Sequence, residues 1–245
     1  MAGLNSIILK IKRGETPFYR TLNKMVRAVL SPKAPRIPGW SRPLFSALYG
    51  LHFTVIGLWH SLLNVCYRQP LFQGRCSSFG RGVVIDRLPY VGGHVDIRIG
   101  DDVWLGGHLS IDSGRLVDRP VLILKDRVKI SWNVVISVSR EVIIEEDVMV
   151  SHGCRISDSD GHPREADLRA QHAPLRPRDI RPVRICKHAW IGNGAHIMKG
   201  VTIGEGAVIG ANSVVISDIP PFSLALGNPA EVLLRNYGRP SKKPE

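Results

Sequence analysis

Cysteine is scarce in this chain, and the few cysteines form no paired motif. All four lie far apart in the sequence, at Cys66, Cys76, Cys154 and Cys186. None belongs to a CxxC pair or to another spacing that is typical of a zinc site. We therefore expect a reduced, cytoplasmic protein without a bound metal.

Two further patterns are missing from the sequence. The basic and mixed N-terminus leads to no short apolar run with a cleavage site, so we expect no signal peptide. The formal net charge is +12, yet no basic motif interleaved with aromatic residues and no helix-turn-helix pattern accompanies it. Nucleic-acid binding is therefore not expected, although the chain is strongly basic.

The C-terminal half has a strict period of six instead. An aliphatic residue recurs at every sixth position, at Ile185, Ile191, Ile197, Ile203, Ile209 and Val215. Neither helical phasing nor strand alternation produces this period, whereas hexapeptide repeats are typical of parallel β-helices. We therefore predict an all-β solenoid in which each aliphatic residue stacks on its equivalent one coil later.

Looser copies of the pattern precede the regular hexads. Three sets keep the spacing of six: Ile99, Leu105 and Ile111; Leu124, Ile130 and Ile136; Ile144, Val150 and Ile156. The phase slips between sets, which indicates bulged corners or small insertions. The largest break separates Ile156 from Ile185, and residues 161–184 within it are rich in proline, arginine and histidine. We expect this segment to leave the solenoid as a loop that is either functional or disordered.

Positive charge is concentrated at the N-terminus. Nine cations precede Pro43 against the single acid Glu15: Lys10, Lys12, Arg13, Arg20, Lys24, Arg27, Lys33, Arg36 and Arg42. From Pro43 to Tyr67 no residue is charged, and the large apolar side chains keep helical spacing. This segment is either a helix that caps the open end of the solenoid or one that lies on an anionic membrane surface. A membrane-spanning helix is possible by length, but His52, His60 and Asn64 disfavour it.

The sequence thus divides into three parts. We expect a basic and apolar helical segment at residues 1–70, and a solenoid at residues 71–238 with a protruding loop at 161–184. A short C-terminal cap ends the solenoid, and residues 239–245 form a flexible tail.

Residues 80–237 resemble the hexapeptide-repeat acyltransferases, in particular the maltose, galactoside and Nod-factor O-acetyltransferases and the type-B chloramphenicol acetyltransferases. The matching landmarks are Trp190–Gly192, Ser213–Val215, Asp218–Pro221 and Gly227–Ala230, together with the run from Ile156 to Pro163. The resemblance implies a left-handed parallel β-helix, a homotrimer, and acetyl-coenzyme A as the co-substrate. Left-handed winding is a known exception to the usual crossover rule, and the period of six does not predict it.

The resemblance also implies a general base. Family enzymes carry a histidine before a proline at the start of the protruding loop, and His162 matches it. A neutral imidazole can take a proton from a sugar hydroxyl while the oxygen attacks a thioester. We expect Asp158 or Asp160 to hold the other ring nitrogen, and Asp160 to lie at the acceptor. Asn133 aligns with a family asparagine at the acceptor pocket, although asparagine at such a corner is also common for structural reasons.

Acyl-coenzyme A lies in this family along the groove between neighbouring subunits. The positions that match its contacts are Asn193, Ala211, Ile216 and Ser217. The sequence departs from the family at three positions. Family members often have a lysine where this chain has Ser217, and they have arginines where it has Glu231 and Leu234. Contacts to the nucleotide phosphates are therefore expected from Arg235 or Lys199.

The predicted activity is acetyl transfer to a saccharide hydroxyl. The basic N-terminal segment favours a lipid-linked acceptor at the cytoplasmic membrane face, such as a precursor of surface polysaccharide or glycolipid, and a small free sugar or an antibiotic is the alternative. Two other classes stay open. One is a γ-type carbonic anhydrase, which His152 and Cys154 resemble locally without a second histidine five residues away. The other is a non-catalytic scaffold, which has no need for the His162 loop.

Overall fold

The computed structural model describes residues 2–31, 36–114 and 116–239 of the chain. It divides into two compact units, Met1–Gly57 and Leu58–Glu245. The predicted flexible tail lies, from residue 240 on, outside the described residues.

The first unit begins with a helical hairpin. Helices α1 (Ala2–Arg13) and α2 (Pro17–Leu30) are joined by a turn at Gly14, whose φ of 64° suits glycine. Thr16 caps α2, because its Oγ1 accepts a hydrogen bond of 3.3 Å from the Tyr19 amide and Pro17 occupies the first turn. A short 3₁₀ turn, η1 (Gly39–Ser41), precedes the next helix.

Helix α3 (Arg42–Leu63) contains most of the uncharged segment and has no buried residue. Its large apolar side chains are exposed along its whole length, from Leu44 at 58% to Leu62 at 54%. Within the described residues, no helix combines the length and the apolar character that crossing a bilayer requires.

The second unit is built from three sheets of short strands. Sheet 1 contains β1 (Ser78–Phe79), β4 (Asp96–Ile99), β7 (Val121–Leu124), β10 (Glu141–Ile144), β13 (Val183–Ile185) and β16 (Thr202–Ile203). Sheet 2 contains β2 (Val84–Ile85), β5 (Trp104–Leu105), β8 (Lys129–Ile130), β11 (Met149–Val150), β14 (Trp190–Ile191), β17 (Val208–Ile209), β19 (Ser223–Gly227) and β20 (Ala230–Arg235). Sheet 3 contains β3 (Tyr90–Gly92), β6 (Ser110–Asp112), β9 (Val135–Ser137), β12 (Arg155–Ser157), β15 (His196–Ile197) and β18 (Val214–Val215).

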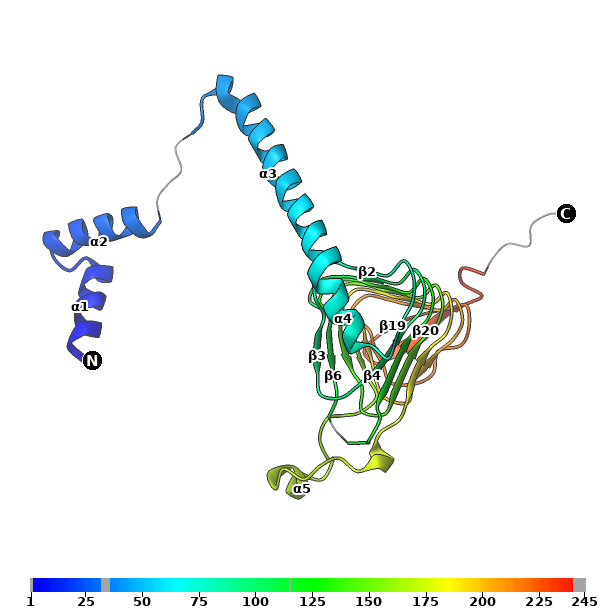
Figure 1. The fold of residues 1–245 in the computed structure, drawn as a ribbon. Helices are drawn as coiled ribbons and strands as arrows, with labels where there is room; N and C mark the ends of the chain where they lie inside the picture. Colours follow the sequence, from blue (N-terminus) through cyan, green and yellow to red (C-terminus); the bar gives the residue numbers. More distant parts are fainter. Residues whose placement is uncertain (1, 32–35, 115, 240–245) are drawn as a thin grey trace. The chain divides into compact units, whose positions relative to one another are not determined.

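The chain visits the three sheets in turn, so each coil contributes one strand to each sheet. The strands pair in parallel with their equivalents one coil away, and Figure 1 shows the resulting triangular prism. In sheet 1, Ile144 pairs with Leu124 on one side and with Ile185 on the other, and Ile185 pairs with Ile203. These side chains are 0 to 1% exposed and form a continuous aliphatic column. The predicted repeat fold of parallel strands, with a helical N-terminal part, is confirmed.

Stacking fixes the shape of two corners. The turns between sheets 1 and 2, such as residues 100–103, and those between sheets 2 and 3, such as residues 131–134, keep one length through the prism. Gly192 lies where successive coils come close, since a Cβ there would be 2.5 Å from the Ile209 carbonyl oxygen. Asn133 adopts a φ of 58° in its corner, a conformation that asparagine tolerates.

Insertions gather at the third corner, from sheet 3 to sheet 1. Residues 113–120 follow β6, residues 138–140 follow β9 and residues 158–182 follow β12. The phase slips of the sequence therefore all fall at this edge of the prism, which we call the sheet 3–1 corner. The unequal lengths of its turns give it an irregular surface.

Different elements close the two ends of the prism. At the first coil, the π-helical turn η2 (Asn64–Arg68) leads into α4 (Gln69–Arg75), whose Phe72 is 1% exposed and belongs to the core. Gln69 and Arg75 donate hydrogen bonds of 2.6 and 3.0 Å to the carbonyl oxygens of Val83 and Val95. The residue that plugs this end thus lies in α4, after the segment 43–67 for which a capping role was considered. At the other end, β20 pairs antiparallel with β19.

Candidate functional site

The segment between β12 and β13, residues 158–182, projects from the sheet 3–1 corner (Figure 1). It contains helix α5 (Ala166–Ala170) and the 3₁₀ turn η3 (Pro177–Asp179). Leu175 and Ile180 are buried, at 5% and 1% exposure, and anchor its returning part. Arg176 ties the loop internally through ion pairs with Glu165 and with Asp179. This projecting loop therefore has a defined shape next to the prism.

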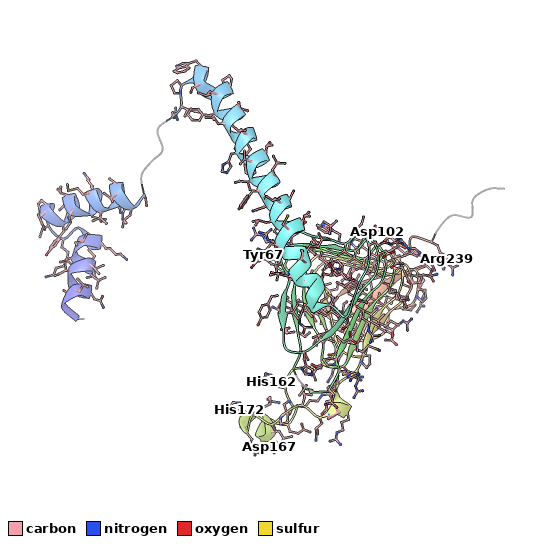
Figure 2. The ribbon with its side chains drawn as sticks, viewed as in Figure 1. Tyr67, Asp102, His162, Asp167, His172 and Arg239 are labelled. Atoms are coloured by element: carbon pink, nitrogen blue, oxygen red, sulfur yellow. The ribbon has the colours of Figure 1, made fainter. Side chains whose placement is uncertain are left out.

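His162 stands at the base of this loop and lines a cavity of about 470 Å³. Its side chain is exposed, and His172, which follows α5, lines the same cavity. Figure 2 shows both histidines at the projecting corner, well separated from Asp102 at another corner of the prism. The remaining lining residues come from three successive coils and from the loop: Asp112, Ser113, Gly114, Leu116, Ser137, Ser139, Ser159, Gly161, Ala173, Pro174 and Leu175.

Hydroxyl groups form a ladder across the floor of the cavity. Ser137 donates a hydrogen bond of 3.0 Å to Asp112 Oδ2, and the hydroxyls of Ser139 and Ser159 are 2.8 Å apart. The parallel register of β6, β9 and β12 places Asp112, Ser137 and Ser157 side by side. Such a surface offers both donors and acceptors to a polyhydroxyl ligand.

Sequence analysis missed this ladder, although a signal was present. Each of the three coils places a hydroxyl or carboxyl residue directly after its inward isoleucine in sheet 3, at Asp112, Ser137 and Ser157. The period of six identifies the inward positions, whereas Asp112 and Ser137 point outward and line the cavity. His172 was not predicted as a site residue because it lies within the protruding loop, yet it lines the cavity.

Asp158 does not orient the imidazole. Its carboxylate is fully buried and accepts hydrogen bonds of 2.7, 2.6 and 2.8 Å from the backbone amides of Ser139, Arg140 and Glu141. Burial raises the pKa of Asp158, and the three amide donors oppose that rise. The residue therefore fixes the start of the loop against the preceding coil.

Asp160 is bound by a lysine. Its Oδ2 lies 2.5 Å from Lys199 Nζ and 3.6 Å from Arg164 Nε. Among the described residues, no hydrogen bond joins either Asp158 or Asp160 to His162. No hydrogen bond among the described residues therefore supports the expectation that one of these carboxylates orients His162. The acceptor-binding role expected of Asp160 stays a prediction.

The other predicted site residues divide between two edges of the prism. Asn133, Asn193 and Ala211 lie at the corner between sheets 2 and 3, and Ile216 and Ser217 lie at the sheet 3–1 corner with His162. All five are exposed. A single chain therefore does not bring Asn133 and His162 into one site.

The corner between sheets 2 and 3 is itself a regular ladder. Backbone hydrogen bonds link its turns, with Gly153 N to Trp132 O at 2.9 Å, Gly194 N to His152 O at 2.8 Å, and Asn212 N to Asn193 O at 2.8 Å. The side-chain nitrogen Nδ2 of Asn133 lies 3.3 Å from His152 Nε2. This edge presents exposed, mostly small or polar residues in a straight row.

The two cations expected at the nucleotide phosphates differ in their surroundings. Arg235 is exposed on β20. Lys199 is buried and paired, so it is not free to bind a phosphate group. The expectation for Lys199 is therefore wrong. In the described part of the chain, no group of three or more histidine, cysteine, aspartate or glutamate side chains is placed to hold a metal ion.

Comparison with known proteins agrees with this architecture. The family profile "Bacterial transferase hexapeptide (six repeats)" matches residues 182–217. A protein of Mycobacterium tuberculosis described as an acetyltransferase is 31% identical over 156 residues, covering 63% of this chain and 48% of its own length. A Staphylococcus aureus protein with the same description is 56% identical over 52 residues, covering 21% of this chain and 26% of its own length. The chain thus spans half or less of these relatives.

Solved structures show the same fold. A hexapeptide-repeat acetyltransferase from Vibrio cholerae, complexed with acetyl-coenzyme A, superposes with a TM-score of 0.50 at 25% identity over 71% of this chain and 78% of that one. An N-acyltransferase from Bacillus cereus, in complex with dTDP and coenzyme A, gives a TM-score of 0.56 at 18% identity over 71% and 91%. The resemblance to hexapeptide-repeat acyltransferases that the sequence predicts is confirmed.

Proposed function

We propose that this protein is an acetyl-coenzyme A-dependent O-acetyltransferase that acts on a saccharide hydroxyl. The observation that carries the proposal is the cavity at the sheet 3–1 corner, where His162 stands above a floor of serine hydroxyls and the Asp112 carboxylate. A hydroxyl-rich floor suits a polyhydroxyl acceptor, and an imidazole at its edge suits a proton acceptor. Similarity to acetyltransferases supplies the acyl donor.

The proposed reaction needs little from the protein beyond positioning and one base. His162 takes the proton of the acceptor hydroxyl while that oxygen attacks the carbonyl carbon of the acetyl thioester. The carbon–oxygen bond forms, the carbon–sulfur bond breaks, and the imidazolium returns the proton to the leaving thiolate of coenzyme A. Asp160 and Asn133 contact the acceptor in this proposal, and Asn193, Ala211, Ile216 and Ser217 contact the pantetheine arm.

The distribution of these residues over two edges supports a homotrimer, and the resemblance to hexapeptide-repeat acetyltransferases supports left-handed winding of each subunit. A neighbouring subunit that sets its sheet 2–3 corner against the sheet 3–1 corner completes a site from both sets of residues. Cyclic symmetry then yields three equivalent sites. Exposed positions such as Asn193 and Ala211 become useful only in such an arrangement.

The activity is tested by measuring coenzyme A release from acetyl-coenzyme A with a panel of acceptors. The panel holds free hexoses, oligosaccharides, a lipid-linked saccharide, and an aminoglycoside for the antibiotic alternative. Transfer to a saccharide, with the acetyl ester located by mass spectrometry, supports the proposal. Transfer only to amines, or to no member of the panel at substrate concentrations well above typical KM values, contradicts it.

The shared site is tested by complementation. His162→Ala disables one edge, and Ala211→Trp obstructs the other edge, so each variant alone is expected to be inactive. When equal amounts are unfolded and refolded together, random assembly gives about one quarter of the sites two intact edges. Recovery of about a quarter of wild-type activity supports a site between subunits. Full inactivity of the mixture, with mixed trimers shown by mass spectrometry, contradicts it.

We also propose that the N-terminal helices attach the protein to the anionic cytoplasmic membrane face, where a lipid-linked acceptor is at hand. On α2, the exposed side chains of Phe18, Met25 and Val29 recur at helical spacing, and Arg20, Lys24 and Arg27 lie between them. The apolar helix α3, which has no buried residue, follows them. Each suitably placed cation contributes about 1 kcal/mol to binding an anionic surface.

Flotation with liposomes tests this attachment. The triple change of Arg20, Lys24 and Arg27 to glutamate is expected to weaken binding to anionic liposomes by at least about a hundredfold, which corresponds to roughly 3 kcal/mol. Reversal of three solenoid cations, Arg81, Lys129 and Arg155, changes the net charge equally and is expected to leave most binding intact. Equal loss in both variants, or no binding of the wild type at low salt, contradicts the proposal.

A further inference from the structure

One buried lysine holds both ends of the projecting loop. Lys199 lies at the sheet 3–1 corner, between β15 and β16, in the coil that follows the loop. Its side chain is 5% exposed. The Nζ atom is 2.5 Å from Asp160 Oδ2 and 3.0 Å from the Asp179 carbonyl oxygen. Asp160 stands near the start of the loop and Asp179 near its end. A single ammonium group therefore binds both the outgoing and the returning segment at the base of the loop.

The fold itself does not require a charge at this position. Lys199 comes two residues after the inward Ile197, and the equivalent residue of the next coil, two after Val215, is the exposed Ser217. A buried lysine loses its hydration and is rarely found without a partner. The two contacts with the loop therefore offset the desolvation of Lys199. We relate the lysine at this position to the loop, because the prism itself does not need it.

The backbone already closes the neck of the loop without the lysine. Arg181 N donates to Asp158 O at 2.9 Å, and Gly200 N donates to Arg181 O at 2.9 Å. The Asp158 carboxylate adds three bonds to the preceding coil. What Lys199 adds is a hold on the residues beyond the neck, and Asp160 is separated from His162 by Gly161 alone. Gly161 has a φ of 77°, and a Cβ added there would have no atom within 4 Å.

We propose that Lys199 is a positioning residue that fixes His162 at the cavity through Asp160 and the Asp179 carbonyl. The inference rests on the proposed role of His162 as the base. Lys199 itself touches neither substrate. Rigid support of this kind matters because a displacement of the base by about 1 Å is enough to lower a rate roughly a hundredfold.

The ion pair of Lys199 and Asp160 also sets the charge beside the His162 imidazole. The pH dependence of the reaction therefore provides a test that a purely structural role would not affect. The charged groups around His162 are Asp160, Lys199 and Arg164 at the loop base, together with His172 and Asp112 in the cavity. Lys199→Met leaves the Asp160 carboxylate without its main partner, which favours the protonated imidazole. Asp160→Asn leaves the ammonium group alone, which favours the neutral imidazole. The two single variants therefore have opposite electrostatic effects.

The test compares pH–rate profiles of full-length protein. Lys199→Met is expected to lower kcat roughly tenfold to a hundredfold and to move the acid limb of kcat/KM up by about half a pH unit or more. Asp160→Asn moves that limb down, and the double variant returns it toward the wild-type position while kcat stays low. Lys187→Met is the matched control, because Lys187 pairs with Glu205 at 3.4 Å at another corner and is half exposed.

A merely structural role predicts a different pattern. Loss of folded enzyme lowers the rate at all pH values and leaves the limb in place, and thermal unfolding of each variant measures that loss. NMR titration of the His162 imidazole in the same proteins reports the shift without any acceptor, so it stands even if no acceptor is acetylated. Unmoved titration midpoints in both single variants, or equal effects of Lys199→Met and Lys187→Met, overturn the proposal. Lack of transfer by the wild type contradicts the proposed function instead.

Discussion

Replacing His162 with alanine is expected to separate activity from stability. The side chain is exposed and makes no hydrogen bond among the described residues, so its removal opens no core cavity and leaves no buried partner unsatisfied. Surface substitutions of this kind change the free energy of unfolding by about 0.5 kcal/mol or less. A positioned general base contributes about 10² to 10⁴ in rate, which corresponds to roughly 2.7 to 5.4 kcal/mol of transition-state stabilisation. Expressed as free energy, the expected loss of transition-state stabilisation thus exceeds the expected change in the free energy of unfolding several-fold.

The assay follows coenzyme A release at saturating acetyl-coenzyme A with an acceptor that the wild type uses, and calorimetry gives the unfolding temperature. His188→Asn is the matched control, since His188 is an exposed histidine at another corner. Its φ of 61° suits asparagine, and its one ion pair joins Nδ1 to Asp147 at 3.8 Å. Surface pairs contribute about 0 to 1 kcal/mol, so this control should keep full activity. Wild-type kcat/KM in His162→Ala would remove His162 from the mechanism, and equal losses in both variants would indicate a structural effect.

Three further predictions test the fold around the site. Gly192→Ala places a Cβ 2.5 Å from the Ile209 carbonyl oxygen, so the coils must separate, and the free energy of unfolding should fall by about 1 to 3 kcal/mol. In the control Gly74→Ala, the added Cβ has no atom within 4 Å, and the melting temperature should rise slightly. Phe72→Ala empties the plug of the first coil and should destabilise by about 3 to 5 kcal/mol in a urea titration, and a loss below about 1 kcal/mol would show that α4 does not close the prism. Burial raises the pKa of Cys76 to about 12 and raises that of Cys154, so both thiols stay protonated at pH 8, and mass spectrometry after alkylation should find the exposed Cys66 modified first.

Periodicity was sufficient to predict the core of the prism. The residues of the three looser sets and of the regular hexads all occupy the column, because an inward side chain at every sixth position is a direct geometric consequence of one strand and one corner per repeat. Within the described residues, Ile111, Ile136 and Ile156 stack in sheet 3 as their spacing implies. The sense of winding follows from resemblance alone, because a period of six is the same for either hand.

The site was harder to predict, because it depends on the projecting loop, which lies outside the hexapeptide repeat. The position of His162 at the base of the loop follows from a local motif, but the partner of Asp160 is Lys199, 39 residues away and on the other side of the loop. No local pattern links these two residues. Part of the hydroxyl floor could have been predicted, since Asp112 and Ser137 follow the inward isoleucines of successive coils and need only the register of sheet 3 to bring them together.

The regularity of the prism explains why its projecting loop and the cavity beside His162 lie at one corner. A longer turn between sheets 1 and 2 or between sheets 2 and 3 would separate coils that the ladder of backbone bonds holds together, as at Gly194 and Asn212. The sheet 3–1 corner tolerates insertions of several lengths, so a cavity and a histidine can be added there without breaking the column. The regular corner offers a straight row of exposed residues, which suits an elongated ligand. An enzyme that needs both surfaces must therefore assemble them from two copies, and complementation between edge variants tests that requirement directly.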